Sequence, residues 1–150
     1  MSQELGDVYG GTLKERAAEM SKVEQVRDNL NDQLQAVRVY VLALQNAREQ
    51  EAARQQAIMD EKASLAQRIV NEVLTVTLLR DKFAKTQIMG YDMEAEKHLS
   101  SLHSLILTNR ALLDHAAWKA VDDYYNRDLP GLTVWQARYA ENLLAAIKQQ

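Results

Sequence analysis

The sequence predicts an all-α protein, and three observations support this fold class. No glycine or proline occurs between Gly11 and Gly90, so half of the chain can form helix without meeting a strong breaker. Ala, Gln, Leu, Glu and Arg dominate the composition, and these residues are good helix formers. Apolar residues recur at spacings of three, four or seven, the pattern of a coiled-coil seam. We therefore expect a long antiparallel coiled-coil hairpin, or a rod, with shorter C-terminal helices that form a helical bundle.

The chain begins with a glycine-rich segment that precedes the first expected helix. Residues 1–11 hold three of the five glycines and predict a flexible N-terminal arm. Thr12 and Glu15 match a capping box, which places the start of a helix over about residues 12–56. Arg27 occupies one slot of its apolar seam. The other positions of that seam are Met20, Val23, Leu30, Leu34, Val37, Val41 and Leu44.

A second seam follows a polar, alanine-rich stretch at residues 45–56. It belongs to a helix expected over about residues 58–89, and Glu72 fills one of its slots. Its apolar members are Ile58, Leu65, Ile69, Val76, Leu79 and Phe83.

The two seams are arranged symmetrically about residues 56–57. A turn there would place Leu30 opposite Phe83 and Leu44 opposite Ile69, which favours a hairpin. No glycine, proline or Asn-Gly pair marks such a turn, although Asp60 is a suitable N-cap. A continuous helix is therefore the open alternative.

Two further helices are expected after the second seam. Gly90 suits the position that ends a helix, and Asp92 suits the cap of the next one, over about residues 92–127. The segment Asp128 to Gly131 is the clearest break in the chain. Beyond it, a capping box that starts at Thr133 opens a last helix over about residues 133–148. Residues 12–150 are thus expected to form a single helical domain.

Composition and charge exclude several classes of partner and chemistry. The formal charge is only −3, and acidic and basic residues are interspersed, so we expect neither nucleic-acid nor membrane binding. The chain has no cysteine, which excludes disulfides and thiolate chemistry. No signal peptide or sufficiently long apolar run is evident, so the sequence favours a protein that is cytoplasmic or assembled from the cytoplasm.

No catalytic or cofactor motif is found. His98, His103 and His115 lack the Glu-x-x-His spacing of di-iron bundles, and an acidic cluster at residues 122–128 lacks the loop of an EF-hand. We therefore expect no enzyme activity, no metal and no cofactor.

Two sets of residues are candidates for contacts with other proteins. Charged residues within a seam, here Arg27 and Glu72, either fix register or extend their charges into solvent. The expected oligomer interface comprises Leu30, Leu34, Val37, Val41, Leu44, Leu65, Ile69, Val76, Leu79 and Phe83. A possible partner patch, which equally suits the anchoring of the last helix, comprises Trp118, Tyr124, Tyr125, Trp135 and Tyr139.

These features favour a non-catalytic structural or assembly protein. Its long amphipathic helices would drive homo-oligomerisation within a larger complex, such as a virion or a secretion machine, with another protein of that complex as a further partner. The alternative is a helical adaptor or chaperone that binds an amphipathic helix of a partner protein.

Overall fold

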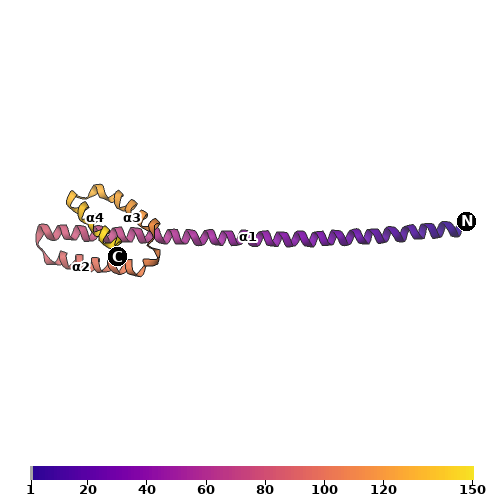
Figure 1. Ribbon diagram of the computed structural model, residues 1–150, viewed down its shortest axis with the longest axis horizontal. Coiled ribbons are helices and arrows are strands. Elements are labelled where there is room, and N and C mark those ends of the chain that lie inside the picture. Colours follow the sequence, from indigo (N-terminus) through magenta and orange to yellow (C-terminus); the bar gives the residue numbers. More distant parts are fainter. Residues whose placement is uncertain (1) are drawn as a thin grey trace. The chain divides into compact units, whose positions relative to one another are not determined.

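The fold is entirely helical over the residues that the structure describes. The computed structural model describes residues 12–150 with their side chains, and the arm predicted for residues 1–11 lies outside the described residues. The all-α class predicted from the sequence is confirmed. The elements are α1 (Ser2–Thr86), α2 (Met89–Thr108), the 3-10 turn η1 (Arg110–Leu112), α3 (His115–Asp128), the 3-10 turn η2 (Leu129–Gly131) and α4 (Val134–Lys148) (Figure 1).

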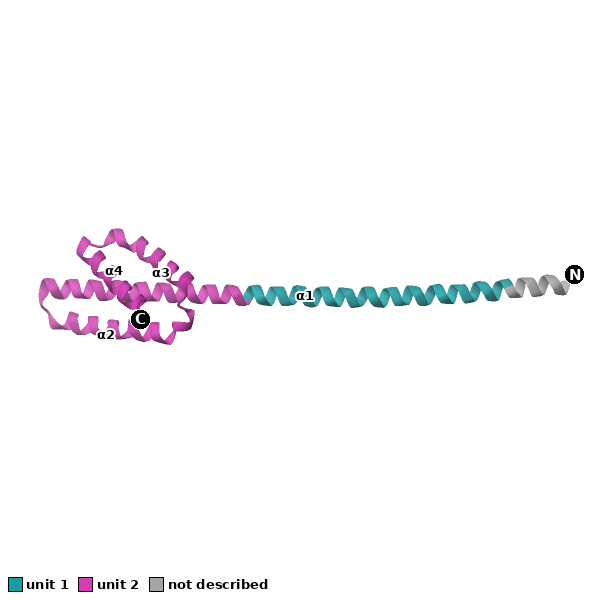
Figure 2. Cartoon of the chain, viewed as in Figure 1, with its two compact units in different colours: residues 1–53 teal, residues 54–150 magenta. Residues whose placement is uncertain are grey.

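The chain divides into two compact units. Unit 1 comprises residues 1–53 and unit 2 comprises residues 54–150 (Figure 2). The sequence predicted one domain over residues 12–150, whereas the structure divides this range after Ala53. Unit 1 contributes only the first part of α1, and each of its residues from Thr12 onward is exposed.

The turn predicted near residues 56–57 is absent, because α1 continues through them to Thr86. The polar stretch at residues 45–56 consists largely of strong helix formers and contains no breaker, so it continues the helix. The two helices predicted over residues 12–56 and 58–89 therefore belong to one element. The predicted pairings of Leu30 with Phe83 and of Leu44 with Ile69 required that turn. Because the turn is absent, both pairings are wrong.

The chain reverses instead at the end of α1. Gln87 takes a left-handed backbone conformation, with φ of 57°, and its N–H donates to the carbonyl of Phe83 at 2.7 Å. Ile88 is extended and directly precedes α2. The sequence pattern placed the end of the helix at Gly90, which lies inside α2 and has no positive φ. A short local hydrogen-bond network, including the Gln87 side-chain N–H that donates to the Ala84 carbonyl, allows a non-glycine residue to end the helix.

Helices α2, α3 and α4 cover the C-terminal part of α1. Helix α2 runs back alongside α1 (Figure 1), and its 20 residues span about 30 Å. It can therefore cover only a comparable length of α1. The core of unit 2 consists of Leu65, Ala66, Ile69, Val70, Val73, Leu102, Ile106, Val121, Tyr125, Ala140, Leu144 and Ile147.

The helix predicted over residues 92–127 is interrupted between α2 and α3. Helix α2 ends at Thr108, and the Asn109 side-chain amide donates to the carbonyl of Leu105 at 2.8 Å. Asp114 then caps α3, because its carboxylate accepts a hydrogen bond from the N–H of Ala117 at 3.0 Å. The local competition of Asn109 with the helical hydrogen bonds and the strong capping tendency of Asp114 explain the break.

The capping box predicted at the start of the last helix is present. The Thr133 hydroxyl accepts from the N–H of Gln136 at 3.2 Å, and the Gln136 side chain accepts from the N–H of Thr133 at 2.9 Å. These reciprocal bonds satisfy two N–H groups at the start of α4. They also account for the burial of the Gln136 side chain, since its carbonyl oxygen has a partner.

The helix reversal generates a stability prediction. Gln87→Gly should raise the free energy of unfolding of unit 2 by about 1 kcal/mol, because glycine tolerates a left-handed backbone. Gly90→Ala should raise the free energy of unfolding by about 0.4–1 kcal/mol, since a Cβ at Gly90 meets no atom within 4 Å and the backbone there suits any residue. Urea unfolding followed by tryptophan fluorescence reports unit 2 alone, because Trp118 and Trp135 are the two tryptophans of the chain. A loss of stability in Gln87→Gly would contradict the assigned reversal.

Candidate functional site

An exposed apolar seam runs along unit 1. We define the N-terminal seam as the set Met20, Val23, Arg27, Leu30, Leu34, Val37, Val41 and Leu44. Its apolar members leave between 39% and 66% of their surface accessible to solvent. Spacings of three and four alternate along it without exception, so these side chains lie on one face of the helix. Among the described residues of unit 1, no second element covers that face.

Arg27 is the one charged position within the N-terminal seam. Its guanidinium lies 3.9 Å from the carboxylate of Asp28, and both side chains are about two-thirds exposed. An exposed ion pair of this kind contributes little to stability. Arg27 is therefore available to a surface that packs against the seam.

The second half of the predicted oligomer interface has a different role. Leu65, Ile69 and Val76 are buried within unit 2, and Leu79 and Phe83 are partly covered. Leu65, Ile69 and Val76 thus pack within the chain and not at an oligomer interface, because α2, α3 and α4 cover this part of the apolar stripe. The interface assignment of Leu79 and Phe83 stays a prediction. Only the members from Leu30 to Leu44 lie on an exposed surface.

A series of polar pairs joins the C-terminal part of α1 to the segment that returns along it. Arg80 pairs with Asp92, Glu72 pairs with His98 at 2.8 Å, and Lys62 pairs with Asp114. The partners move forward along the chain as the positions on α1 move backward. We call these three contacts the polar ladder; they fix the antiparallel register of unit 2.

Glu72 was recognisable in the sequence as a charged seam position, but its partner was not. The Glu72 carboxylate lies beside Nδ1 of His98, and both side chains are partly buried. His98 lies on α2 and makes this contact within the chain. The antiparallel return of α2, once recognised, is the signal that would have paired them.

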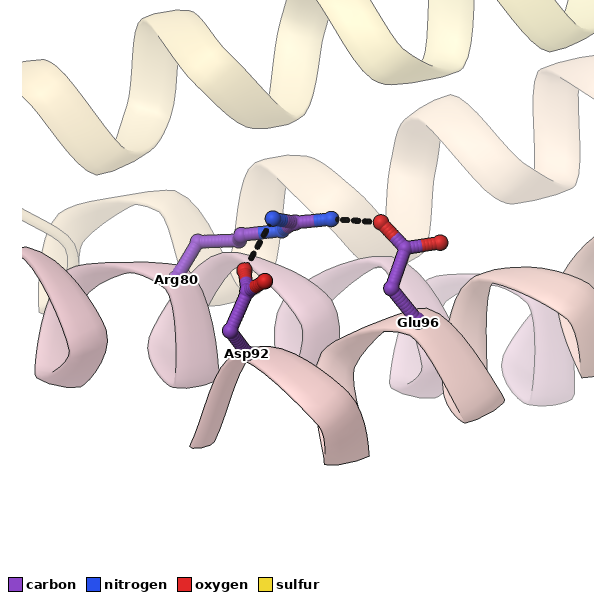
Figure 3. Close-up of polar contacts among 3 residues, drawn as sticks. All are labelled: Arg80, Asp92 and Glu96. Carbon is purple, nitrogen blue, oxygen red and sulfur yellow. Dashed lines mark hydrogen bonds and ion pairs between the residues drawn. The ribbon is translucent and has the colours of Figure 1, made fainter. Parts of the chain in front are cut away.

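Arg80 is the cation of the polar ladder that contacts two carboxylates. Its guanidinium reaches two carboxylates of the first turns of α2, those of Asp92 and Glu96 (Figure 3). Burial lowers the pKa of Arg80, but the hydrogen bond to Glu96 and the charge of Asp92 outweigh this effect and raise it. The Nε atom of Arg80 is buried and has no hydrogen-bond partner among the described residues. The positive charge of Arg80 is therefore compensated by these two carboxylates.

The five aromatic residues of the predicted partner patch do not form one exposed surface. Tyr125 is buried and its hydroxyl donates to the carbonyl of Ala137 at 2.7 Å, so it belongs to the core. Trp135 stacks on Tyr139 with ring centroids 5.6 Å apart, and Trp135 is about half exposed.

The other two aromatic residues are partly buried beneath cations. The Arg127 guanidinium lies over the ring of Tyr124 and the Lys148 ammonium lies over the ring of Trp118. The contact of Lys148 with Trp118 joins α4 to α3, whereas Arg127 and Tyr124 both belong to α3. Trp135 is the most exposed aromatic side chain of the predicted patch.

The described part of the chain gives little support for a metal site or for a membrane-spanning segment. No group of three or more potential ligands that could hold a metal ion occurs there. None of the helices there combines the length and apolarity that a membrane span requires. Comparison with known proteins shows no matching family model, no matching curated protein and no matching solved structure. The exposed N-terminal seam is therefore the candidate functional site.

The polar ladder generates a prediction about Arg80. Arg80→Met should destabilise unit 2 by about 1–3 kcal/mol, because it leaves the partly buried carboxylate of Asp92 without its cation. Arg80→Lys should lower the free energy of unfolding by a smaller amount, since a lysine retains the charge but not the planar guanidinium that reaches two carboxylates. Arg68→Met, at an exposed position of the same helix, is the matched control. Equal effects of Arg80→Met and Arg68→Met in urea unfolding followed by tryptophan fluorescence would refute the role of Arg80.

Asp114 generates a prediction about pH. The hydrogen bond from Lys62, together with the N–H of Ala117, lowers the pKa of this carboxyl group in the folded protein. A lowered folded pKa means that the ionised group stabilises the fold above its ordinary pKa, and that this contribution is lost as the pH falls through the folded value. Asp114→Asn keeps the capping oxygen but removes the charge. Its melting temperature should lie below that of the unmodified protein at neutral pH. The difference should begin to shrink below about pH 4, the ordinary pKa of an aspartate, and should vanish once the pH has fallen below the lowered folded pKa.

The control for this titration is Asp123→Asn, which removes a carboxylate at an exposed position of α3. Its melting temperature should follow that of the unmodified protein at every pH. A difference for Asp114→Asn that persists unchanged to low pH would show that the lost charge is not the cause.

Proposed function

We propose that this chain is a non-catalytic structural protein that self-associates through the N-terminal seam and serves as a component of a larger assembly. The observation that carries the proposal is the exposure of a regular heptad seam on a helix that no second element covers within the described residues of unit 1. Seven apolar side chains on one helical face are unfavourable in water, and such faces mark protein interaction sites.

The charge pattern supports a protein surface as the partner of the seam. The helix faces around the seam carry both signs of charge, which suits neither a phosphate backbone nor an anionic lipid surface. Unit 2 closes its own core, so the seam is not needed to complete the bundle. The two units can thus divide their tasks: unit 2 is a folded module and unit 1 is a contact surface.

A substitution at the centre of the seam tests this function. Leu34→Asp should abolish self-association, because it places a charge in the middle of the apolar contact. Gln25→Asp introduces the same charge on the opposite face of the helix and should leave the oligomer intact. Light scattering coupled to size-exclusion chromatography measures the mass of each variant.

The outcome also discriminates between the two candidate functions. An oligomer of defined mass that Leu34→Asp converts to a monomer supports the structural role. A monomer for the unmodified protein at all concentrations would refute self-association. It would instead support the adaptor alternative, in which the seam binds an amphipathic helix of another protein.

A further inference from the structure

We infer that the N-terminal seam pairs with the seam of a second copy in antiparallel orientation, centred on Asp32. This inference rests on the proposed self-association and adds the partner, its direction and its register. Two features carry it: the heptad positions of the exposed residues and the charges beside them.

The apolar positions of the seam match one another best when one copy is reversed. In heptad notation Met20, Arg27, Leu34 and Val41 occupy a positions, and the remaining seam residues occupy d positions. Reversal about Asp32 brings every a position opposite a d position of the second copy. The resulting layers are Met20 with Leu44, Val23 with Val41, Arg27 with Val37, and Leu30 with Leu34, each occurring twice by symmetry.

This register uses the whole seam. A shift of one heptad towards the C-terminus would set Met20 and Val23 against charged residues and reduce the buried apolar area. A shift of one heptad in the other direction would bring a second charged residue, Arg16, into the core opposite Val41. In the unshifted register, the layer that contains Arg27 carries a valine on the other helix, along which the arginine side chain can extend towards solvent. A parallel, in-register pair would instead set Arg27 against Arg27 of the second copy, and like charges in one core layer repel.

The residues that flank the seam also favour the antiparallel pair. Glu24 and Arg38 both follow d positions, and reversal places them across from each other, which gives two pairs of opposite charge. On the other flank, Val26 lies across from Tyr40, and both side chains are more than half exposed in the single chain. A parallel pair would bring Glu19 of one copy beside Glu24 of the other, which is a repulsive contact.

Disulfide linkage tests the orientation directly, and the absence of native cysteine removes any background. The variants Met20→Cys and Leu44→Cys are prepared separately as full chains and oxidised alone or after mixing. In the antiparallel pair the two identical cysteines lie about 36 Å apart, far beyond the reach of a disulfide. The mixture should therefore yield a disulfide between residues 20 and 44, identified by mass spectrometry, and neither variant alone should yield one.

Each result of this experiment supports or overturns a defined statement. A disulfide in either variant alone overturns the antiparallel inference but leaves self-association standing. A monomeric mass for the unmodified protein, with no linkage in any sample, overturns both the inference and the proposed function. Linkage in all samples indicates non-specific association and also overturns the defined register.

A charge exchange provides an independent measurement that does not depend on the reactivity of cysteines. Glu24→Arg should raise the dissociation constant of the pair roughly tenfold, because it sets a second guanidinium across from that of Arg38. Adding Arg38→Glu should return the constant to within about threefold of the original. Asp32→Arg is the matched control, because it changes the net charge by the same amount as Glu24→Arg but lies on the helix face that points away from the seam. Tighter association of Glu24→Arg would overturn the inference, because only a parallel pair would gain from removing Glu24.

Discussion

One constraint governs this molecule: α1 carries an apolar stripe that is longer than the rest of the chain can cover. The stripe begins at Met20 and ends near Phe83, whereas α2 has only 20 residues and the helices that follow are shorter. A returning helix covers a length of its partner about equal to its own. The chain can therefore enclose only the C-terminal part of the stripe, and the remainder stays in contact with water. The same heptad pattern thus forms a core in unit 2 and a surface in unit 1.

Within unit 2, apolar packing supplies the driving force and the polar ladder supplies the register. The core side chains would tolerate small displacements of α2 along α1, since most of them are aliphatic and similar in size. The contacts of Arg80 with Asp92 and of Glu72 with His98 do not tolerate such a displacement. A shift of α2 by one turn would leave partly buried charges without partners. Arg80 is the clearest case, since its Nε already lacks a partner among the described residues.

The sequence was informative wherever structure depends on local patterns. The all-α class follows from composition and period, and the capping box at Thr133 follows from two residue types at a fixed spacing. The turns were harder to predict, because a turn reflects what the flanking helices gain from packing. Gln87 adopts a left-handed conformation three residues before a glycine that carried the expected signal, and the gain from docking α2 outweighs this local cost. The same reasoning explains why the seam around Leu65 could not be separated from the seam around Leu34: both have the period of a coiled coil, and only the length of the covering helices distinguishes core from surface.

The exposed helix of unit 1 carries more apolar surface than one partner helix can cover. Val39 and Leu42 are each 57% exposed, yet both lie off the N-terminal seam and face away from a helix packed on it. Residues 37–44 are consequently apolar on nearly all sides, a composition typical of helices that other helices surround. An antiparallel pair would bury the seam and would carry two such strips, related by its symmetry axis. Contacts through these strips would join pairs to one another or to a different protein, so the step from a pair of chains to a larger assembly requires only the apolar side chains that the seam leaves uncovered.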